Sequence, residues 1–119
     1  MTRLLRGQVV RADVGLDEPK RFADVGLDEP KRFIVVSNNL RNRHFEQVLT
    51  VRMTTTTKRE RPSIVKLTAA DAPHGGFIVC DDIVTIWEDE VVDVLTGVSP
   101  LTMRRVELGL LAALGISMR

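Results

Sequence analysis

The chain has 119 residues, of which 44% are hydrophobic and 28% are charged, and these proportions fit one soluble globular domain with a modest core. One cysteine excludes an internal disulfide, and two histidines do not predict a closed zinc site. The sequence contains no apolar run of membrane-spanning length and does not start with a secretory signal. We therefore expect a single cytoplasmic domain without a cofactor and without a membrane partner.

The net charge of +1 hides an uneven distribution of charge along the sequence. Between residues 31 and 66, nine basic residues stand against two acidic ones, whereas from residue 67 onward three basic residues stand against eight acidic ones. A basic middle in an otherwise neutral chain favours a surface that binds a polyanion. The alternative is that these charges are scattered over the surface and solvated.

The segment 6–15 predicts a first strand, because it is rich in β-branched valine and ends in glycine. Residues 12–22 are then repeated without change as residues 23–33. Two copies of eleven residues are too short for a repeat architecture, and their identity points to a recent duplication, either natural or artificial. We expect one domain over residues 1–119 in which the duplication lengthens the first loop. The first strand would then end within residues 12–15 and the second would begin at residue 31.

Two further strands are predicted at residues 33–37 and 48–53. The strand at 33–37 is continuously apolar, as in a strand covered on both faces, whereas Thr50 and Arg52 indicate that the strand at 48–53 is half exposed. If the two pair as an antiparallel hairpin, Lys31 and Arg32 come to the same end as Thr54. A cation beside a hydroxyl at a sheet edge suits the stabilisation of a charged phosphoryl transition state.

The connection between these strands, residues 38–44, is polar and is predicted to be a loop. Its cations suit phosphates, while its amides and imidazole can hydrogen-bond to or stack on unpaired bases. The candidate RNA-binding residues of this loop are Asn38, Arg41, Asn42, Arg43 and His44.

The second half of the chain predicts more strands and one helix. Strands are expected at residues 63–67, 77–80, 83–87 and 91–98, with Asp81 and Asp82 interrupting one of them. Adjacent carboxylates in a strand point to opposite faces, so at least one should face a site or solvent. The helix begins after Ser99 as N-cap and ends at Gly115. We expect its apolar stripe to pack on the sheet, and this stripe consists of Leu101, Val106, Leu108, Leu111, Ala112 and Leu114.

Four short motifs, in the same order and over nearly the whole chain, resemble the MazF/PemK family. They are Arg6-Gly7-Gln8-Val9, Phe33-Ile34-Val35-Val36-Ser37-Asn38, Arg52-Met53-Thr54-Thr55 and Val79-Cys80-Asp81-Asp82-Ile83. Members of this family are toxins of toxin–antitoxin pairs that cleave single-stranded RNA. The resemblance implies a mainly β fold, a small SH3-like (CcdB/PemK-type) β-barrel with a C-terminal α-helix. It also implies a homodimer with RNA in grooves at its interface and a cognate MazE-like antitoxin.

The resemblance further implies which residues act in catalysis. Lys31 falls where much of the family has an arginine, and Arg32 falls where it has a proline, although some relatives carry lysine. Thr54 matches a threonine that binds the reacting phosphate. Asp81 matches an acid that some members use as a base, but the arginine expected two residues earlier is Val79 here. The remaining candidate RNA-binding residues are Thr55, Lys58, Arg59 and Asp82.

We therefore predict a sequence-specific, metal-independent endoribonuclease that leaves a 2′,3′-cyclic phosphate and a 5′-hydroxyl. One alternative is a non-catalytic toxin of the same fold that inhibits DNA gyrase, as CcdB-type proteins do. Those proteins use a tryptophan near the C-terminus, whereas the only tryptophan here is Trp87. The other alternative is a non-catalytic RNA-binding barrel, which is favoured if Lys31 and Thr54 lie far apart. For the individual residues, the alternative is that Lys31 and Arg32 are a plain solvent-exposed pair and that Asp81 is a structural carboxylate.

Overall fold

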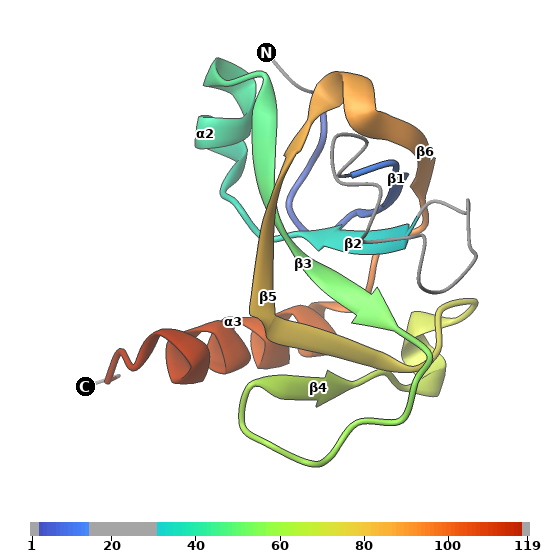
Figure 1. Cartoon of the computed structure of the whole chain (residues 1–119), viewed down its shortest axis with the longest axis vertical. Helices are drawn as coiled ribbons and strands as arrows, with labels where there is room; N and C mark the ends of the chain where they lie inside the picture. Colours follow the sequence, from blue (N-terminus) through green and yellow to red (C-terminus); the bar gives the residue numbers. More distant parts are fainter. Residues whose placement is uncertain (1–2, 15–30, 118–119) are drawn as a thin grey trace.

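The computed structural model describes residues 3–14 and 31–117. Six strands form one antiparallel sheet in the order β4-β5-β3-β2-β1-β6 (Figure 1). The strands are β1 (Val9–Ala12), β2 (Lys31–Val35), β3 (Gln47–Thr54), β4 (Ile64–Lys66), β5 (Phe77–Trp87) and β6 (Val91–Leu95). The helices are α2 (Asn39–His44) and α3 (Pro100–Leu114), with short 3-10 turns η1 (Ala69–Asp71) and η2 (Glu88–Glu90).

The predicted antiparallel hairpin of β2 and β3 is confirmed, with Phe33 opposite Arg52 and Val35 opposite Thr50. The apolar residues 33–35, which end β2, are buried, as expected for a strand covered on both faces. The expectation that Thr50 helps to make β3 half exposed is wrong. Thr50 is fully buried because its hydroxyl donates to the carbonyl oxygen of Val84 over 2.8 Å, which satisfies the polar group inside the core.

Strand β1 ends at Ala12, which lies opposite Lys31 at the start of β2. The first strand is therefore shorter than the segment 6–15, although its last residue falls within the expected range 12–15. The expected long loop from Leu16 to Pro30 lies outside the described residues.

Strand β5 is one continuous strand, so the expectation that Asp81 and Asp82 interrupt it is wrong. Val51 on β3 pairs with Ile83, but the next residue, Arg52, pairs with Val79. The three residues 80–82 are therefore extra on β5 and form a bulge, where the strand bends sharply (Figure 1). Because of the bend, β5 pairs with β3 on both sides of the bulge and also with β4 through residues 77–79.

The expected barrel is an open sheet in the described part of the chain. Strands β4 and β6 lie at its two edges, and no ladder joins them. The mainly β class with a C-terminal helix is confirmed, while closure is not. Within the described residues, no helix is long and apolar enough to cross a membrane.

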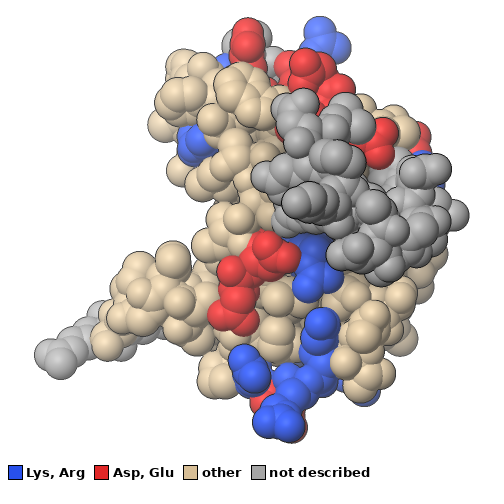
Figure 2. All heavy atoms as spheres, in the orientation of Figure 1, with Lys and Arg blue, Asp and Glu red and all other residues tan. Residues whose placement is uncertain are grey.

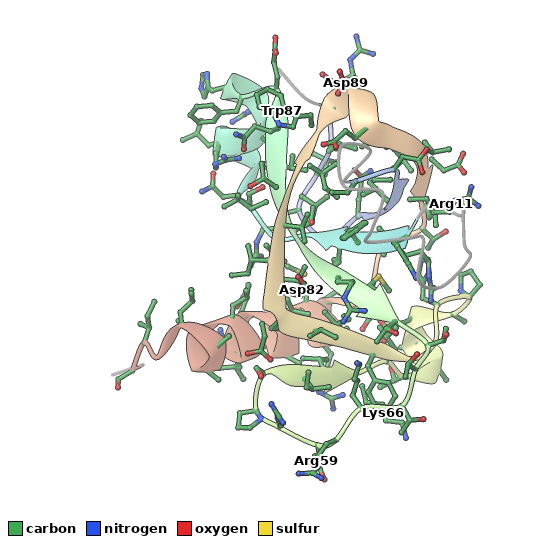
Figure 3. The ribbon with its side chains drawn as sticks, in the orientation of Figure 1. Arg11, Arg59, Lys66, Asp82, Trp87 and Asp89 are labelled. Atoms are coloured by element: carbon green, nitrogen blue, oxygen red, sulfur yellow. The ribbon has the colours of Figure 1, made fainter. Side chains whose placement is uncertain are left out.

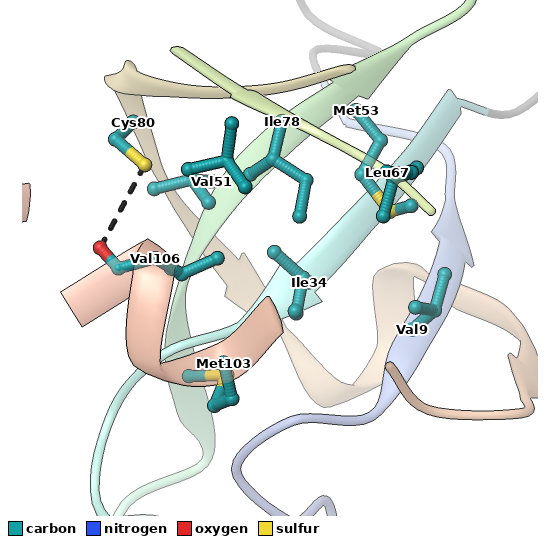
Figure 4. Packing of buried hydrophobic residues seen from close by; sticks show 10 residues of the cluster. Val9, Ile34, Val51, Met53, Leu67, Ile78, Cys80, Met103 and Val106 are labelled. Carbon is teal, nitrogen blue, oxygen red and sulfur yellow. Dashed lines mark hydrogen bonds between the residues drawn. The ribbon is translucent and has the colours of Figure 1, made fainter. Parts of the chain in front are cut away.

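Two cores pack on the two faces of the bent sheet. The first core contains Ile34, Val51 and Ile78, which pack against Met103 and Val106 of α3 (Figure 4). The second core contains Phe33, Val35, Val48, Val84 and Ile86. Cys80 belongs to the first core, and burial, assisted by the nearby Asp81 charge, raises the pKa of its thiol to about 12. Cys80 therefore serves as a small buried residue of the core.

The segment predicted as a polar loop is a helix, α2. The side chain of Asn38 accepts a hydrogen bond from the Arg41 N–H over 2.8 Å and so caps its first turn. Asn42 is fully buried because its side chain bonds to the hydroxyl and the carbonyl of Ser37. These two asparagines convert the connection into a folded element.

Helix α3 has the predicted boundaries, with the Ser99 hydroxyl accepting from the Thr102 N–H and Gly115 at φ +71°. Its predicted apolar stripe is mostly wrong, since only Val106 is buried and Leu111 is half-buried. The buried face consists of Thr102, Met103, Val106 and Gly109, whereas Leu101, Leu108 and Leu114 are exposed. The small residue at 109 explains the choice of face, because a Cβ there would lie 2.7 Å from the Cys80 sulfur. The helix backbone thus approaches the β5 bulge closely.

Candidate functional site

Arg52 and Asp82 face each other where β5 bends. The Nε of Arg52 donates to Oδ2 of Asp82 over 2.6 Å, and both side chains are about 30% exposed (29% and 33%). Asp82 reaches this position because the bulge of residues 80–82 turns it toward β3. Figure 3 shows Asp82 at the bend, and Figure 2 shows an acidic patch beside a basic one on this face. The bend thus carries a fixed guanidinium with a carboxylate to orient it.

Thr54 ends β3 and lies opposite Phe77 on β5. Its Oγ1 accepts from the Thr56 N–H over 3.1 Å, which leaves its hydroxyl proton to donate to another acceptor. Gly76 packs against its backbone, since a Cβ at Gly76 would lie 2.2 Å from the Thr54 carbonyl oxygen. The segment 74–76 is therefore an immediate neighbour of Thr54.

Lys31 begins β2 and is half buried. The register that places Phe33 opposite Arg52 would, continued by two residues, place Lys31 opposite Thr54. The β2–β3 ladder ends at Phe33, however, so this last step is not hydrogen-bonded. Because side chains alternate along a strand, Lys31, Phe33, Arg52 and Thr54 belong to the same face of the sheet. The structure thus gives Lys31, Thr54 and the Arg52–Asp82 pair one common face.

Arg32 belongs to the opposite face and interacts with the segment 74–76. Its Nη1 lies 3.2 Å from Nδ1 of His74, and its Nη2 donates to the carbonyl oxygen of Gly75 over 3.5 Å. Among the described residues, no carboxylate lies within ion-pairing distance of Arg32. Arg32 and Thr54 thus contact the same short segment, Arg32 through residues 74 and 75 and Thr54 through residue 76.

A hollow of about 230 Å³ lies between the segment after β3 and the bulge of β5. Its lining residues are Lys58, Arg59, Arg61, Ile64, Val79 and Asp81. Lys and Arg gather at this end of the molecule (Figure 2), and Arg59 and Lys66 mark it in Figure 3. Asp81 is held toward this hollow by Ser63, whose hydroxyl donates to Oδ2 over 2.6 Å. A larger hollow of about 350 Å³ beside β6 is lined by none of the predicted site residues.

The predicted residues of α2 do not join this group. Helix α2 lies at the start of β3, whereas Thr54 lies at the end of that eight-residue strand, on the order of 25 Å away. Figure 1 shows α2 beside the start of β3, away from the arrowhead that marks the end of this strand. Arg43 and His44 are exposed there, whereas Arg41 is tied down by hydrogen bonds to Gln47 and by stacking over Phe45.

Two of the α2 assignments need correction. Asn42 is buried at 0% exposure, so its amide serves the fold and is not available to RNA. Asn38 is exposed, but its side-chain oxygen caps α2, so its first role is structural. The sequence suggests both as RNA contacts because polar residues between two strands usually mark a loop.

Two residues of the site do not stand out in the sequence. Arg52 belongs to one of the four family motifs but is given no role of its own there, and nothing around His74 indicates a role. The alternation of β3 could have placed Arg52 on the face of Thr54. No sequence pattern could have paired Arg32 with His74, since 42 residues separate them.

A buried carboxylate, Asp71, fixes the segment that carries His74. Burial alone would raise the pKa of Asp71, but hydrogen bonds from the backbone of Ser99 and Thr68 and from the hydroxyl of Thr102 lower it to about 2. The carboxylate thus joins η1 to the first turn of α3. No group of three potential metal ligands is present among the residues that the structure describes.

Residues 5–114 match the family model of the PemK-like, MazF-like toxin of type II toxin–antitoxin systems. The chain belongs to this family. It is 39% identical over 116 residues to endoribonuclease MazF1 of Mycobacterium bovis and to endoribonuclease MazF4 of Mycobacterium tuberculosis, covering 98% of this chain and 97% of each relative. Among solved structures, it resembles an endoribonuclease in complex with its cognate antitoxin from Mycobacterial species. That likeness has a TM-score of 0.81 and 38% identity, and it covers 98% of this chain and 99% of the other.

Proposed function

We propose that this chain is the toxin of a type II toxin–antitoxin pair and acts as a sequence-specific endoribonuclease on single-stranded RNA without a metal ion. The observation that carries the proposal is the common face of Lys31, Arg52, Asp82 and Thr54 at the bend of the sheet. The family membership and the named endoribonuclease relatives support the reaction class.

In the proposed reaction, the 2′-hydroxyl of the RNA loses its proton to a base, for which Asp81 is the candidate, and its oxygen attacks the adjacent phosphorus while the bond from phosphorus to the 5′-oxygen breaks. The products are a 2′,3′-cyclic phosphate and a 5′-hydroxyl, and the leaving 5′-oxygen takes up one proton. Lys31 is the candidate to supply that proton and to stabilise the negative phosphorane. The hydroxyl of Thr54 and the guanidinium of Arg52 are candidate donors to the non-bridging oxygens.

Two neighbouring groups of cations have separate proposed roles. Arg32 has no carboxylate partner among the described residues, so it is available to an RNA phosphate and is the alternative catalytic cation. Lys58 and Arg59 line the hollow at the end of β3, where they would hold the RNA backbone. Asp81, which Ser63 orients toward the same hollow, is a candidate base or base-contacting group.

The proposed assembly is a homodimer that a cognate antitoxin inhibits. The solved relative that is complexed with its antitoxin supports such a partner for this chain. Exposed apolar side chains on α3, namely Leu101, Leu108 and Leu114, provide surface for a protein contact.

Substitutions at the proposed site test this function. Lys31→Ala and Thr54→Ala should each slow cleavage of a long RNA by roughly a hundredfold or more, as loss of one transition-state donor typically does. His44→Ala on α2 is the matched control and should cleave as the parent chain does. Full activity of Lys31→Ala together with an inactive Arg32→Ala would move the catalytic role to Arg32. Wild-type activity of all three site variants would refute the site.

A further inference from the structure

His74 is a nearly buried histidine that the proposed reaction does not use. It is 6% exposed and lies between β2 and the segment before α3. Its two ring nitrogens face different partners: Nε2 lies 2.6 Å from the carbonyl oxygen of Thr96, and Nδ1 lies 3.2 Å from Nη1 of Arg32. Each nitrogen therefore has one defined contact.

These two contacts fix the proton on the imidazole. A carbonyl oxygen only accepts hydrogen bonds, so Nε2 must carry the proton that it shares with Thr96. A guanidinium only donates, so Nδ1 must keep its lone pair to accept from Arg32. A doubly protonated ring would have no lone pair for Arg32 and would place two positive charges about 3 Å apart. The arrangement is therefore that of the neutral Nε2–H tautomer.

The acceptor on His74 is important for Arg32 because the other neighbours of its guanidinium do not fix its position. Directly opposite on β1 lies Arg11, a like charge on the same face, which Asp93 neutralises over 3.3 Å. The remaining contact of Arg32, to the carbonyl of Gly75, is long at 3.5 Å. The Asp71 carboxylate, three residues before His74, is occupied by Thr68, Ser99 and Thr102. Among the described residues, the imidazole is thus the principal partner of Arg32.

From this geometry we propose that His74 is a positioning residue, which as the neutral Nε2–H tautomer holds the Arg32 guanidinium at the segment that borders Thr54. The contacts to Nδ1 and to Gly75 use two of the five N–H donors of a guanidinium. Gly76 packs on the Thr54 backbone, so this anchoring joins Arg32 to the end of β3 where RNA is proposed to bind. The contact between His74 and Arg32 does not depend on the proposed function; only its expected effect on RNA cleavage rests on that function.

Two substitutions separate the two hydrogen bonds of His74. In His74→Asn the amide oxygen takes the place of Nδ1 and keeps an acceptor for Arg32, whereas the bond to Thr96 is lost. In His74→Gln the amide nitrogen takes the place of Nε2 and keeps a donor to Thr96, whereas the acceptor at the Nδ1 position is lost. A positioning role predicts that the asparagine variant retains the higher kcat/KM. A role limited to anchoring at Thr96 predicts the reverse order and would overturn the proposal.

The effect should also disappear when Arg32 is absent. We expect kcat/KM to fall roughly tenfold or more in His74→Gln and in Arg32→Ala, with no further fall in the double variant, because both remove one interaction. Additive losses, or an Arg32→Ala variant as active as the parent chain, would contradict the positioning role.

Nitrogen NMR of the histidine rings in the full chain tests the contact without RNA. The expected spectrum at neutral pH shows His74 protonated at Nε2 only, with an Nδ1 resonance that shifts in Arg32→Ala. A ring protonated at Nδ1 would overturn the proposal even if the protein cleaves RNA. An Nδ1 resonance with the same chemical shift in the parent chain and in Arg32→Ala would do the same. A protein with the expected spectrum that cuts no RNA would instead refute the proposed function and leave the contact intact.

Discussion

Arg52 and Asp82 are joined by a 2.6 Å hydrogen bond across the bend of β5, where three extra residues turn the strand. The bend changes the direction of β5, and it also brings a carboxylate to an arginine that lies opposite Phe33 of β2. The same irregularity therefore shapes the sheet and orients a cation on the face of Lys31 and Thr54.

Breaking this pair should affect cleavage more than stability. Both side chains are partly exposed, so the pair contributes at most about 1 kcal/mol to the free energy of unfolding. We expect Arg52→Ala to lower kcat/KM roughly a hundredfold, since it removes a candidate transition-state donor. Chemical denaturation and steady-state cleavage measure the two effects separately.

Arg104→Ala is the control for this prediction. Arg104 also pairs with a carboxylate, Glu107 over 3.0 Å, but on the exposed side of α3. Its loss should leave cleavage unchanged. Equal losses of activity in the two variants would mean that Arg52 contributes only its positive charge and not a hydrogen bond to the reacting phosphate.

The salt dependence of RNA binding should come from the cations at the end of β3. Each phosphate contact with single-stranded RNA contributes about −0.7 to the slope of log K against log salt. Replacing Lys58 and Arg59 by alanine removes two such contacts and should therefore make the slope less steep by about 1.4. Arg43→Ala removes an exposed cation from α2, at the other end of β3, and should leave the slope unchanged. The reverse result would move the RNA to the α2 end.

Asp71 should stabilise the fold at neutral pH and lose that effect in acid. Its pKa is lowered in the folded state to about 2, so its contribution is present above the unfolded value near 4 and is lost as the pH falls toward 2. The difference corresponds to about 2 kcal/mol. Between pH 5 and pH 2, the free energy of unfolding should therefore fall by about that much more in the parent chain than in Asp71→Asn. Parallel curves for the two proteins would contradict this role.

Removing one copy of the duplicated segment should leave the fold intact. Ala12 is the last residue of β1 and lies opposite Lys31, and deletion of residues 12–22 puts an identical alanine in its place. The connection between Ala12 and Lys31 shortens from 18 to 7 residues, which changes the closure entropy by only about 0.8 kcal/mol. Thermal unfolding should thus shift little. A deletion variant that does not fold would show that the extra copy has a structural part.

The sequence predicted the elements that depend on local signals. Apolar runs located the strands, and Ser99 and Gly115 gave the ends of α3 correctly because caps act within one turn. The prediction for the segment 38–44 was wrong, since its helix depends on Asn38 and Asn42 making hydrogen bonds that polarity alone does not reveal. The predicted buried face of α3 was wrong because close approach to Cys80 requires Gly109, and hydrophobicity alone favours the leucines.

The placement of the candidate site residues was likewise predicted only where it depends on local signals. The antiparallel register brought Lys31 and Thr54 to one end of the hairpin, as expected. The contacts of Arg52 with Asp82 and of Arg32 with His74 depend on the bulge and on a distant loop, and neither leaves a local pattern in the sequence. Long-range packing therefore decided which cations were oriented and by which partners.

The most direct test of the account is cleavage of a long single-stranded RNA by the purified chain in excess EDTA, with chemical mapping of the new ends. The account predicts that cutting continues at a short recognition sequence and that every cut leaves a 2′,3′-cyclic phosphate and a 5′-hydroxyl. It also predicts that Lys31→Ala and Thr54→Ala slow the reaction at least roughly a hundredfold under the same conditions. Cleavage that requires a divalent metal, or that leaves a 3′-hydroxyl and a 5′-phosphate, would contradict it.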